Sequence, residues 1–189
     1  MALSKIDVAN MVTGAVPVAN GGTALTSGFV NGGGLTMTDQ WRLTSTFTGD
    51  ANPIASNLEQ VDTSGQGTLG SAMTESSGIF TFPATGIYLV RFILTARNTE
   101  TGGSSETQLE AHIEVTTDNS SYTLVAETHG SDNSENSEAF TMCETLVDVT
   151  NTTNVKVRFT VETVRSGTLI LASSTKNNTH MTFTRLGDT

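Results

Sequence analysis

The fold is decided by the stretch Ser77-Gly-Ile-Phe-Thr-Phe-Pro-Ala-Thr-Gly-Ile-Tyr-Leu-Val90, which places a rigid turn between two apolar segments. Pro83 fixes its own φ angle and Gly86 permits φ values that other residues avoid, so the chain can reverse sharply here. Phe80 before the turn and Tyr88 after it are large side chains suited to core packing. We therefore expect strands at 78–82 and 86–96, with Phe80 and Tyr88 on paired strands.

Short segments with the residue pattern of β-strands lie on both sides of this stretch. Strict alternation from Trp41 to Phe47 predicts a half-buried strand with Arg42 on its polar side. Further strands are expected at 108–116, 122–127, 138–149, 155–163, 168–172 and 180–185, with a weak strand at 68–73 and an ambiguous segment at 54–61. Roughly nine or ten strands separated by turn residues predict an all-β jelly-roll β-sandwich.

Residues 1–38 differ from the rest of the chain because glycines recur between short apolar pieces. Glycine loses much conformational entropy on ordering and offers no side chain to pack, so this segment is not expected to form a core of its own. We interpret 1–38 as an extended N-terminal anchoring arm and 39–189 as the jelly-roll interaction domain. The arm residues expected to dock on a partner are Val12, Val16, Pro17, Val18, Leu25 and Phe29.

Charge and hydropathy restrict the classes of partner that this protein is expected to bind. The formal net charge is −10, and an acidic surface repels the phosphate backbone, so we expect no nucleic-acid binding. No apolar run approaches the ~20 residues of a membrane span. The opening Met-Ala-Leu-Ser-Lys-Ile-Asp lacks the long apolar core of a secretory signal. We therefore expect a protein made in a cytoplasm, without membrane insertion.

The turn region resembles the signature of C1q/TNF-like jelly rolls, in which Gly-x-Phe, a proline and Gly-x-Tyr lead into a long core strand. The matching residues are Gly78, Phe80, Pro83, Gly86 and Tyr88. The resemblance covers residues 40–187 and implies a compact homotrimer around an axis lined with apolar and aromatic side chains. Candidates for that axis are Phe92, Tyr122 and Phe183, although ordinary core placement is favoured for each of them.

A second resemblance concerns the arm. Val12-Thr-Gly-Ala-Val-Pro-Val-Ala-Asn-Gly-Gly-Thr23 is similar to a spacer segment of bacteriophage tail-fibre and other virion proteins. It implies a virion structural protein: a homotrimeric capsid decoration (cement) or head-fibre protein, anchored to a capsid protein through the arm. The alternative is a tail-fibre tip or receptor-binding protein that joins a tail component and contacts a host surface glycan or protein.

The acidic loop 130–138 is a candidate recognition loop through Asp132, Glu135 and Glu138, and 98–106 is a second polar loop. The three acidic residues could also bind calcium, but their spacing does not match an EF-hand, and a solvated loop is favoured. The single cysteine, Cys143, lies in a predicted strand and is expected to be a small buried side chain.

Catalytic sites are not expected. His112, His129 and His180 lie far apart in the sequence, without the close spacing of a zinc site. Glu110 and Glu114 share one strand face, which suits a solvent-facing surface as well as a carboxylate pair of a carbohydrate-active enzyme. The sequence contains no Gly-x-Ser-x-Gly nucleophile elbow. We therefore expect neither an enzyme nor a cofactor, and a structural role for the histidines.

Overall fold

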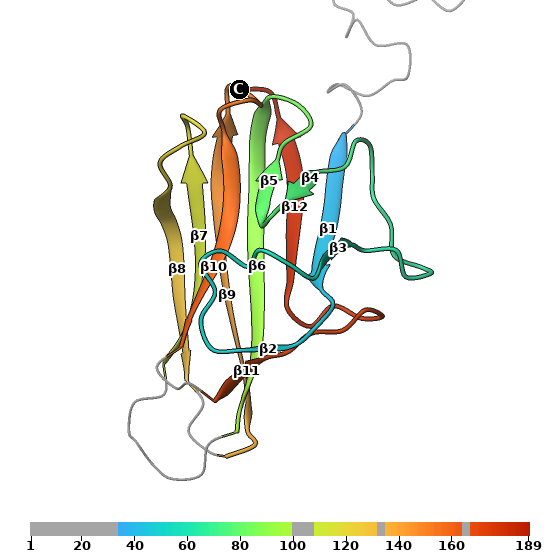
Figure 1. Cartoon of the computed structure of the whole chain (residues 1–189). Coiled ribbons are helices and arrows are strands. Elements are labelled where there is room, and N and C mark those ends of the chain that lie inside the picture. The colour runs from blue at the N-terminus through green and yellow to red at the C-terminus, as the bar shows by residue number, and fades with distance from the viewer. Residues whose placement is uncertain (1–33, 100–107, 132–134, 164–166) are drawn as a thin grey trace, which may run out of the picture. The chain divides into compact units, whose positions relative to one another are not determined.

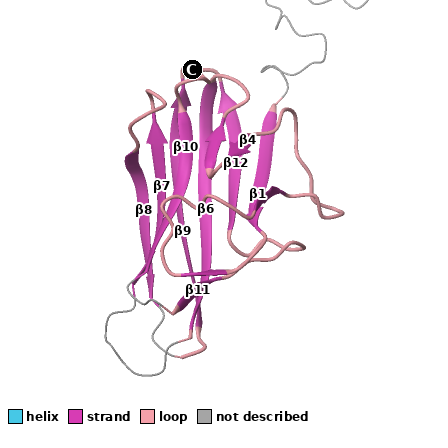
Figure 2. Ribbon diagram, viewed as in Figure 1, coloured by secondary structure: helices cyan, strands magenta, loops and turns pink. Residues whose placement is uncertain are grey.

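A computed structural model describes residues 34–99, 108–131, 135–163 and 167–189, and this part of the chain is a sandwich of β-strands (Figure 1). Every regular element in these ranges is a strand (Figure 2), and none of them contains a helix long and apolar enough to span a membrane. The arm residues named above lie outside the described ranges. The strands are β1 (Met37–Leu43), β2 (Phe47–Thr48), β3 (Leu58–Gln60), β4 (Thr74–Ser76), β5 (Ile79–Thr81), β6 (Gly86–Asn98), β7 (Gln108–Thr116), β8 (Thr123–Ser131), β9 (Glu138–Val149), β10 (Lys156–Thr163), β11 (Thr168–Ile170) and β12 (His180–Gly187).

The strands form two antiparallel sheets. In the first, β6 is paired with β9 on one side and with β12 on the other, and β12 leads on to β1 and β3. The short strands β11 and β2 extend this sheet from the end of β6. The second sheet has the order β4-β5-β10-β7-β8. The chain passes repeatedly from one sheet to the other, as between β5 and β6, β6 and β7, and β9 and β10, and this topology is the predicted jelly roll.

The long strands β6, β7, β9, β10 and β12 confirm the sequence prediction closely, and the short strands β5 and β11 lie within the predicted segments 78–82 and 168–172. The prediction is less accurate in the first part of the domain. The alternating segment 41–47 is divided, since β1 ends at Leu43 and β2 begins at Phe47. The weak strand predicted at 68–73 is reduced to a single bridge between Thr38 and Leu69. β1 begins at Met37, so it includes the last two residues that the sequence assigned to the arm.

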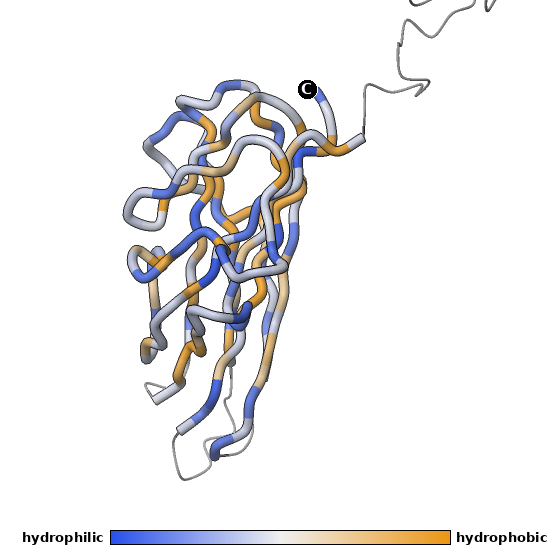
Figure 3. Tube along the Cα trace, turned by 90° about the vertical axis from the view of Figure 1, so that its right-hand side faces the viewer, coloured by the Kyte–Doolittle hydropathy of each residue, from blue (hydrophilic) through white to orange (hydrophobic). Residues whose placement is uncertain are grey.

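An aromatic cluster joins the two sheets. Figure 3 shows hydrophobic and hydrophilic residues alternating along the strands, as expected when one face of each sheet is buried. The ring of Phe80 lies 5.4 Å from Phe159 and 5.2 Å from Phe183, and Phe92 lies 5.1 Å from Phe159. All four side chains are buried. Their edge-on and tilted contacts are the geometry that aromatic pairs prefer.

One expectation for the turn region is wrong. Phe80 lies on β5 and Tyr88 on β6, and these strands belong to opposite sheets rather than forming a pair. The chain between them therefore crosses from one sheet to the other. Both side chains are buried, as expected, and the Tyr88 hydroxyl donates a hydrogen bond to the carbonyl of Ala84 at 2.9 Å. Burial raises the pKa of the Tyr88 phenol above its usual range, so this hydroxyl remains a donor at neutral pH.

Substituting Gly86 with alanine should destabilise the domain. Gly86 has φ +142°, and a Cβ here would lie 2.5 Å from the backbone oxygen of Gly187. Such backbone strain costs about 1–3 kcal/mol, to which the clash adds. The matched control is G67A, since nothing lies within 4 Å of a Cβ at Gly67. Urea unfolding of both variants checks this prediction, and equal stabilities would contradict it.

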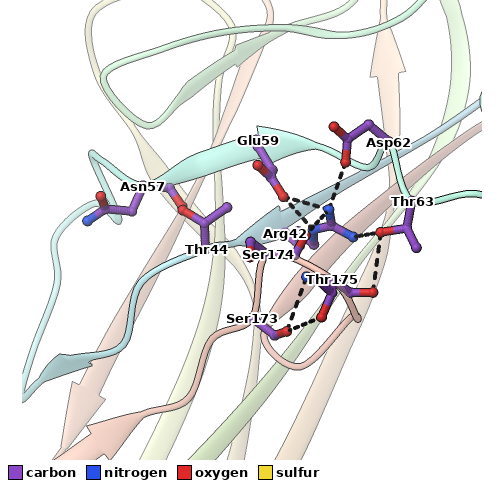
Figure 4. Close-up of polar contacts among 9 residues, drawn as sticks. All are labelled: Arg42, Thr44, Asn57, Glu59, Asp62, Thr63, Ser173, Ser174 and Thr175. Atoms are coloured by element: carbon purple, nitrogen blue, oxygen red, sulfur yellow. Dashed lines mark hydrogen bonds and ion pairs between the residues drawn. The ribbon is translucent and has the colours of Figure 1, made fainter.

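A buried cation fixes the loops beside β1 (Figure 4). Arg42 was expected on the solvent side of its strand, but its side chain is fully buried. Its guanidinium donates to Glu59 at 2.6 Å, to Thr63 at 2.7 Å, to Asp62 at 2.9 Å and to the carbonyl of Ser174 at 2.5 Å. The expectation fails because the 58–63 and 173–175 segments cover this side of the strand. Arg42 thereby ties two loops to β1.

A buried anion lies three residues earlier in the same strand. The Asp39 carboxylate accepts hydrogen bonds from the Trp41 indole, the Gln60 amide, the Thr68 hydroxyl and the Met73 backbone, at 2.8–3.1 Å. These donors satisfy a charge that would otherwise be costly to bury. Asp39 therefore holds the long connection between β3 and β4 against the sheet.

Candidate functional site

An apolar surface covers the outer side of β9 and β6. On β9, Phe140 is 74% exposed, Leu146 62% and Met142 43%. On β6, Leu89 lies opposite Leu146 and Ile93 lies opposite Met142, and both are partly exposed. We call Phe140, Met142, Leu146, Leu89 and Ile93 together the β9 face.

The pattern of β9 explains how this face arises. Thr141, Cys143 and Val147 alternate with the exposed residues and point toward the other sheet, where they are buried. The outer side of the strand therefore carries three large apolar residues among its acidic ones, where solvent-facing strands are normally polar. A single exposed leucine needs no explanation, but a contiguous apolar patch on a sheet usually marks an interaction surface.

An ion pair lies within the β9 face. Arg91 on β6 and Glu144 on β9 are cross-strand neighbours, with the guanidinium 2.8 Å from the carboxylate, and both side chains are partly exposed. Exposed pairs of this kind add little stability in water. A charged pair among apolar side chains can instead fix the orientation in which another protein binds to this surface.

β9 also forms one edge of the sandwich. Among the described strands, it pairs only with β6 in its own sheet, and β8 pairs only with β7 in the other. The two edges meet where the Thr141 hydroxyl donates to the Thr128 hydroxyl at 3.1 Å. β8 carries two exposed apolar residues of its own, Leu124 and Val125, and Leu124 lies opposite Glu114 in the second sheet. The strand that carries most of the β9 face is thus also an edge strand.

The proposed axial residues do not contribute to this face. Phe92 and Phe183 are fully buried between the sheets, which confirms core placement for these two. Tyr122 lies on the outer side of the second sheet, where the Arg158 guanidinium stacks 4.2 Å above its ring. Arg158 also donates to Glu114 at 2.5 Å, so Glu114 is part of an ion pair. Glu110, its predicted neighbour on the same face, contacts histidine instead.

Cys143 is buried, as expected. Its thiol donates to the carbonyl of Ala111 across the core at 3.4 Å. Burial raises the pKa of the thiol to about 12, so the nucleophilic thiolate is scarce at neutral pH. A small packing group is the role that this environment supports.

The candidate recognition loop is only partly described. Asp132 lies outside the described residues, as does most of the 98–106 loop. Glu135 is exposed, whereas Glu138 begins β9 and forms an ion pair with Arg97. Glu138 therefore belongs to the sheet rather than to the loop.

The structure brings together two histidines that the sequence treated as separate. His112 on β7 and His129 on β8 both contact Glu110, at 3.1 and 3.5 Å. His112 lies on the outer side of the sheet, but neighbouring side chains bury it. The strand predicted at 122–127 stops short of His129, whereas the observed strand β8 continues to Ser131 and includes this histidine. His180 lies in the other sheet.

The two sheets, their strand order and the connection through 77–90 define a TNF-like jelly roll. Comparison with solved structures supports this class. The chain is similar to an Eiger TNF structure from S. frugiperda, with a TM-score of 0.56 and 11% identity, over 82% of this chain and 95% of that one. It is also similar to murine APRIL, with a TM-score of 0.55 and 9% identity, over 79% of this chain and 98% of that one. At these identities the likeness shows the fold alone. No protein-family model and no curated protein matched the sequence.

Proposed function

We propose that this protein is a bacteriophage virion structural protein that works as a homotrimer. In this proposal it decorates the capsid or projects from it as a short head fibre, and residues 1–38 anchor it to the shell. The observation that carries the proposal is the β9 face, an apolar surface on a domain that is otherwise well packed.

Self-association is the use of the β9 face that we favour. Residues such as Phe140 and Leu146 would be covered by a second copy, and burial of a large apolar side chain contributes about 1.5–3 kcal/mol. Most of the face lies on the edge strand β9, so one copy can present its edge to the sheet of the next. Repeating such a head-to-tail contact closes a ring when the rotation between copies allows it. A three-membered ring agrees with the trimer that the C1q/TNF-like signature implies.

Attachment to a virus particle is supported by a different observation. The 12–23 segment is similar to spacers of bacteriophage fibre and virion proteins. The net charge of −10 would complement a basic partner surface. The same spacer favours a second candidate function, a tail-fibre tip or receptor-binding protein.

Immunogold electron microscopy of purified virions distinguishes these functions. The antibody should be raised against residues 39–189, so that it recognises the folded domain. Label over the heads would support decoration or a head fibre. Label confined to the tail would instead support the assignment as a tail-fibre protein. The absence of label from every particle would contradict a virion role.

A further inference from the structure

We infer that the outer surface of the second sheet holds a binding site for a divalent transition-metal ion, formed by Glu110, Glu127 and His129. This site is independent of the proposed virion role. One ligand atom from each of the three residues lies within 4.8 Å of the other two. Carboxylate and imidazole groups together suit zinc and its neighbours better than calcium, which prefers oxygen ligands alone.

The hairpin of β7 and β8 creates this arrangement. In its register, Glu110 lies opposite His129 and His112 lies opposite Glu127. Residues two apart on a strand share a face, so these four side chains form a block in which histidine and glutamate alternate. His129 lies between the two carboxylates, with Nε2 2.5 Å from Glu127 and Nδ1 3.5 Å from Glu110. The hairpin thus gathers one imidazole and two carboxylates so closely that one ligand atom from each lies within 4.8 Å of the other two.

One side of the site is already held in position. The Glu110 side chain is only 18% exposed, and its carboxylate lies 3.1 Å from Nε2 of His112. The other nitrogen of His112 contacts the hydroxyl of Thr160 at 3.2 Å, and both of these residues are buried. Metal-binding carboxylates are typically oriented by a second layer of hydrogen bonds like this one. Thr160 and His112 therefore act as positioning residues for Glu110.

The remaining two ligands can move to complete the coordination. Glu127 and His129 are both exposed, so their side chains can adjust without disturbing the core. Zinc bonds of about 2.0–2.2 Å in tetrahedral coordination place two ligand atoms about 3.4 Å apart, so atoms that lie up to 4.8 Å apart must approach one another by up to about 1.4 Å. The charge also favours a cation, because Glu162 lies opposite Glu110 on the neighbouring strand β10. Arg158 on the same face is already paired with Glu114.

Calorimetric titration of zinc chloride into the full chain tests the site. The protein should carry no polyhistidine tag and should first be dialysed against a chelator. We expect saturable binding of one zinc ion per chain. H129Q and E127Q should each weaken binding more than about 100-fold, and H112Q by about 10–100-fold through the orientation of Glu110. The matched control H180Q should bind zinc as the wild type does, since His180 lies in the other sheet.

A second measurement keeps the test valid if a variant is less stable. Zinc should raise the melting temperature of the wild type and of H180Q, because a ligand that binds only the folded state stabilises it, but not that of H129Q. Circular dichroism before titration shows which variants are folded. The inference is overturned if the wild type shows no saturable binding, or if H129Q and E127Q bind zinc as tightly as the wild type. An equal loss of affinity in H180Q would also overturn it.

Discussion

Replacing Phe140 and Leu146 together with serine should convert the proposed trimer into folded monomers. Both side chains are largely exposed in the single chain, so their loss removes no core contact. If a neighbouring copy covers them, the double variant loses about 3–6 kcal/mol of association free energy per chain, from two side chains at about 1.5–3 kcal/mol each. Size-exclusion chromatography with light scattering measures the mass, and thermal unfolding shows that the domain is intact.

Leu69 provides the control for this experiment. It has comparable exposure but lies on the connection between β3 and β4, away from β9. L69S should therefore leave the assembled mass unchanged. If the double variant keeps its assembled mass, or if L69S dissociates the protein equally, the β9 face is not the surface that joins the copies.

Replacing Arg42 with alanine should have the largest effect on the stability of the domain itself. Its guanidinium is fully buried and bonds to Glu59, Asp62, Thr63 and the carbonyl of Ser174. The substitution leaves these groups without their cation and opens a cavity beneath two loops. Removing one partner of a buried ion pair typically costs about 3–5 kcal/mol. Urea denaturation followed by tryptophan fluorescence measures the loss, because Trp41 is the adjacent residue.

The matched control for Arg42 is an arginine in an exposed ion pair. Arg97 pairs with Glu138 at the surface, and both side chains are about half exposed. Exposed pairs contribute about 0–1 kcal/mol, so R97A should be close to wild type. If R42A is also within about 1 kcal/mol of wild type, then the Arg42 network does not hold the loops as we describe.

The alternating patterns of the long strands could be predicted because each strand has one face in the core. The pattern of β6 is nearly perfect: Tyr88, Val90, Phe92 and Leu94 are all buried and the residues between them are partly exposed. The pattern fails at Arg42, which is buried by loops that pass over the outer side of the sheet. Alternation along one strand carries no information about segments that arrive from elsewhere in the chain.

The β9 face was missed for a related reason. Apolar residues on both sides of a strand indicate burial on both sides, but they do not tell whether the same chain or another copy covers the second side. Here no described segment of the chain covers Phe140 or Leu146. The axial candidates were instead chosen for their aromatic character, and Phe92 and Phe183 turn out to fill the core.

The histidine and glutamate cluster depends on a detail that the sequence does not reveal. The register between β7 and β8 shifts at Ile113 and Glu114, where β8 contains an irregularity. A shift of one residue moves every later side chain to the opposite face. The face occupied by His129 therefore follows from that shift, and the separation of the histidines in sequence conceals their contact with Glu110.

The most direct test of the central claim is sedimentation equilibrium of the full chain at micromolar concentration. We predict a single species with three times the mass of one chain, because the β9 face should be covered by another copy in a closed ring of three. A mass equal to one chain would contradict self-association through this face, and a mass of two chains would contradict the trimer.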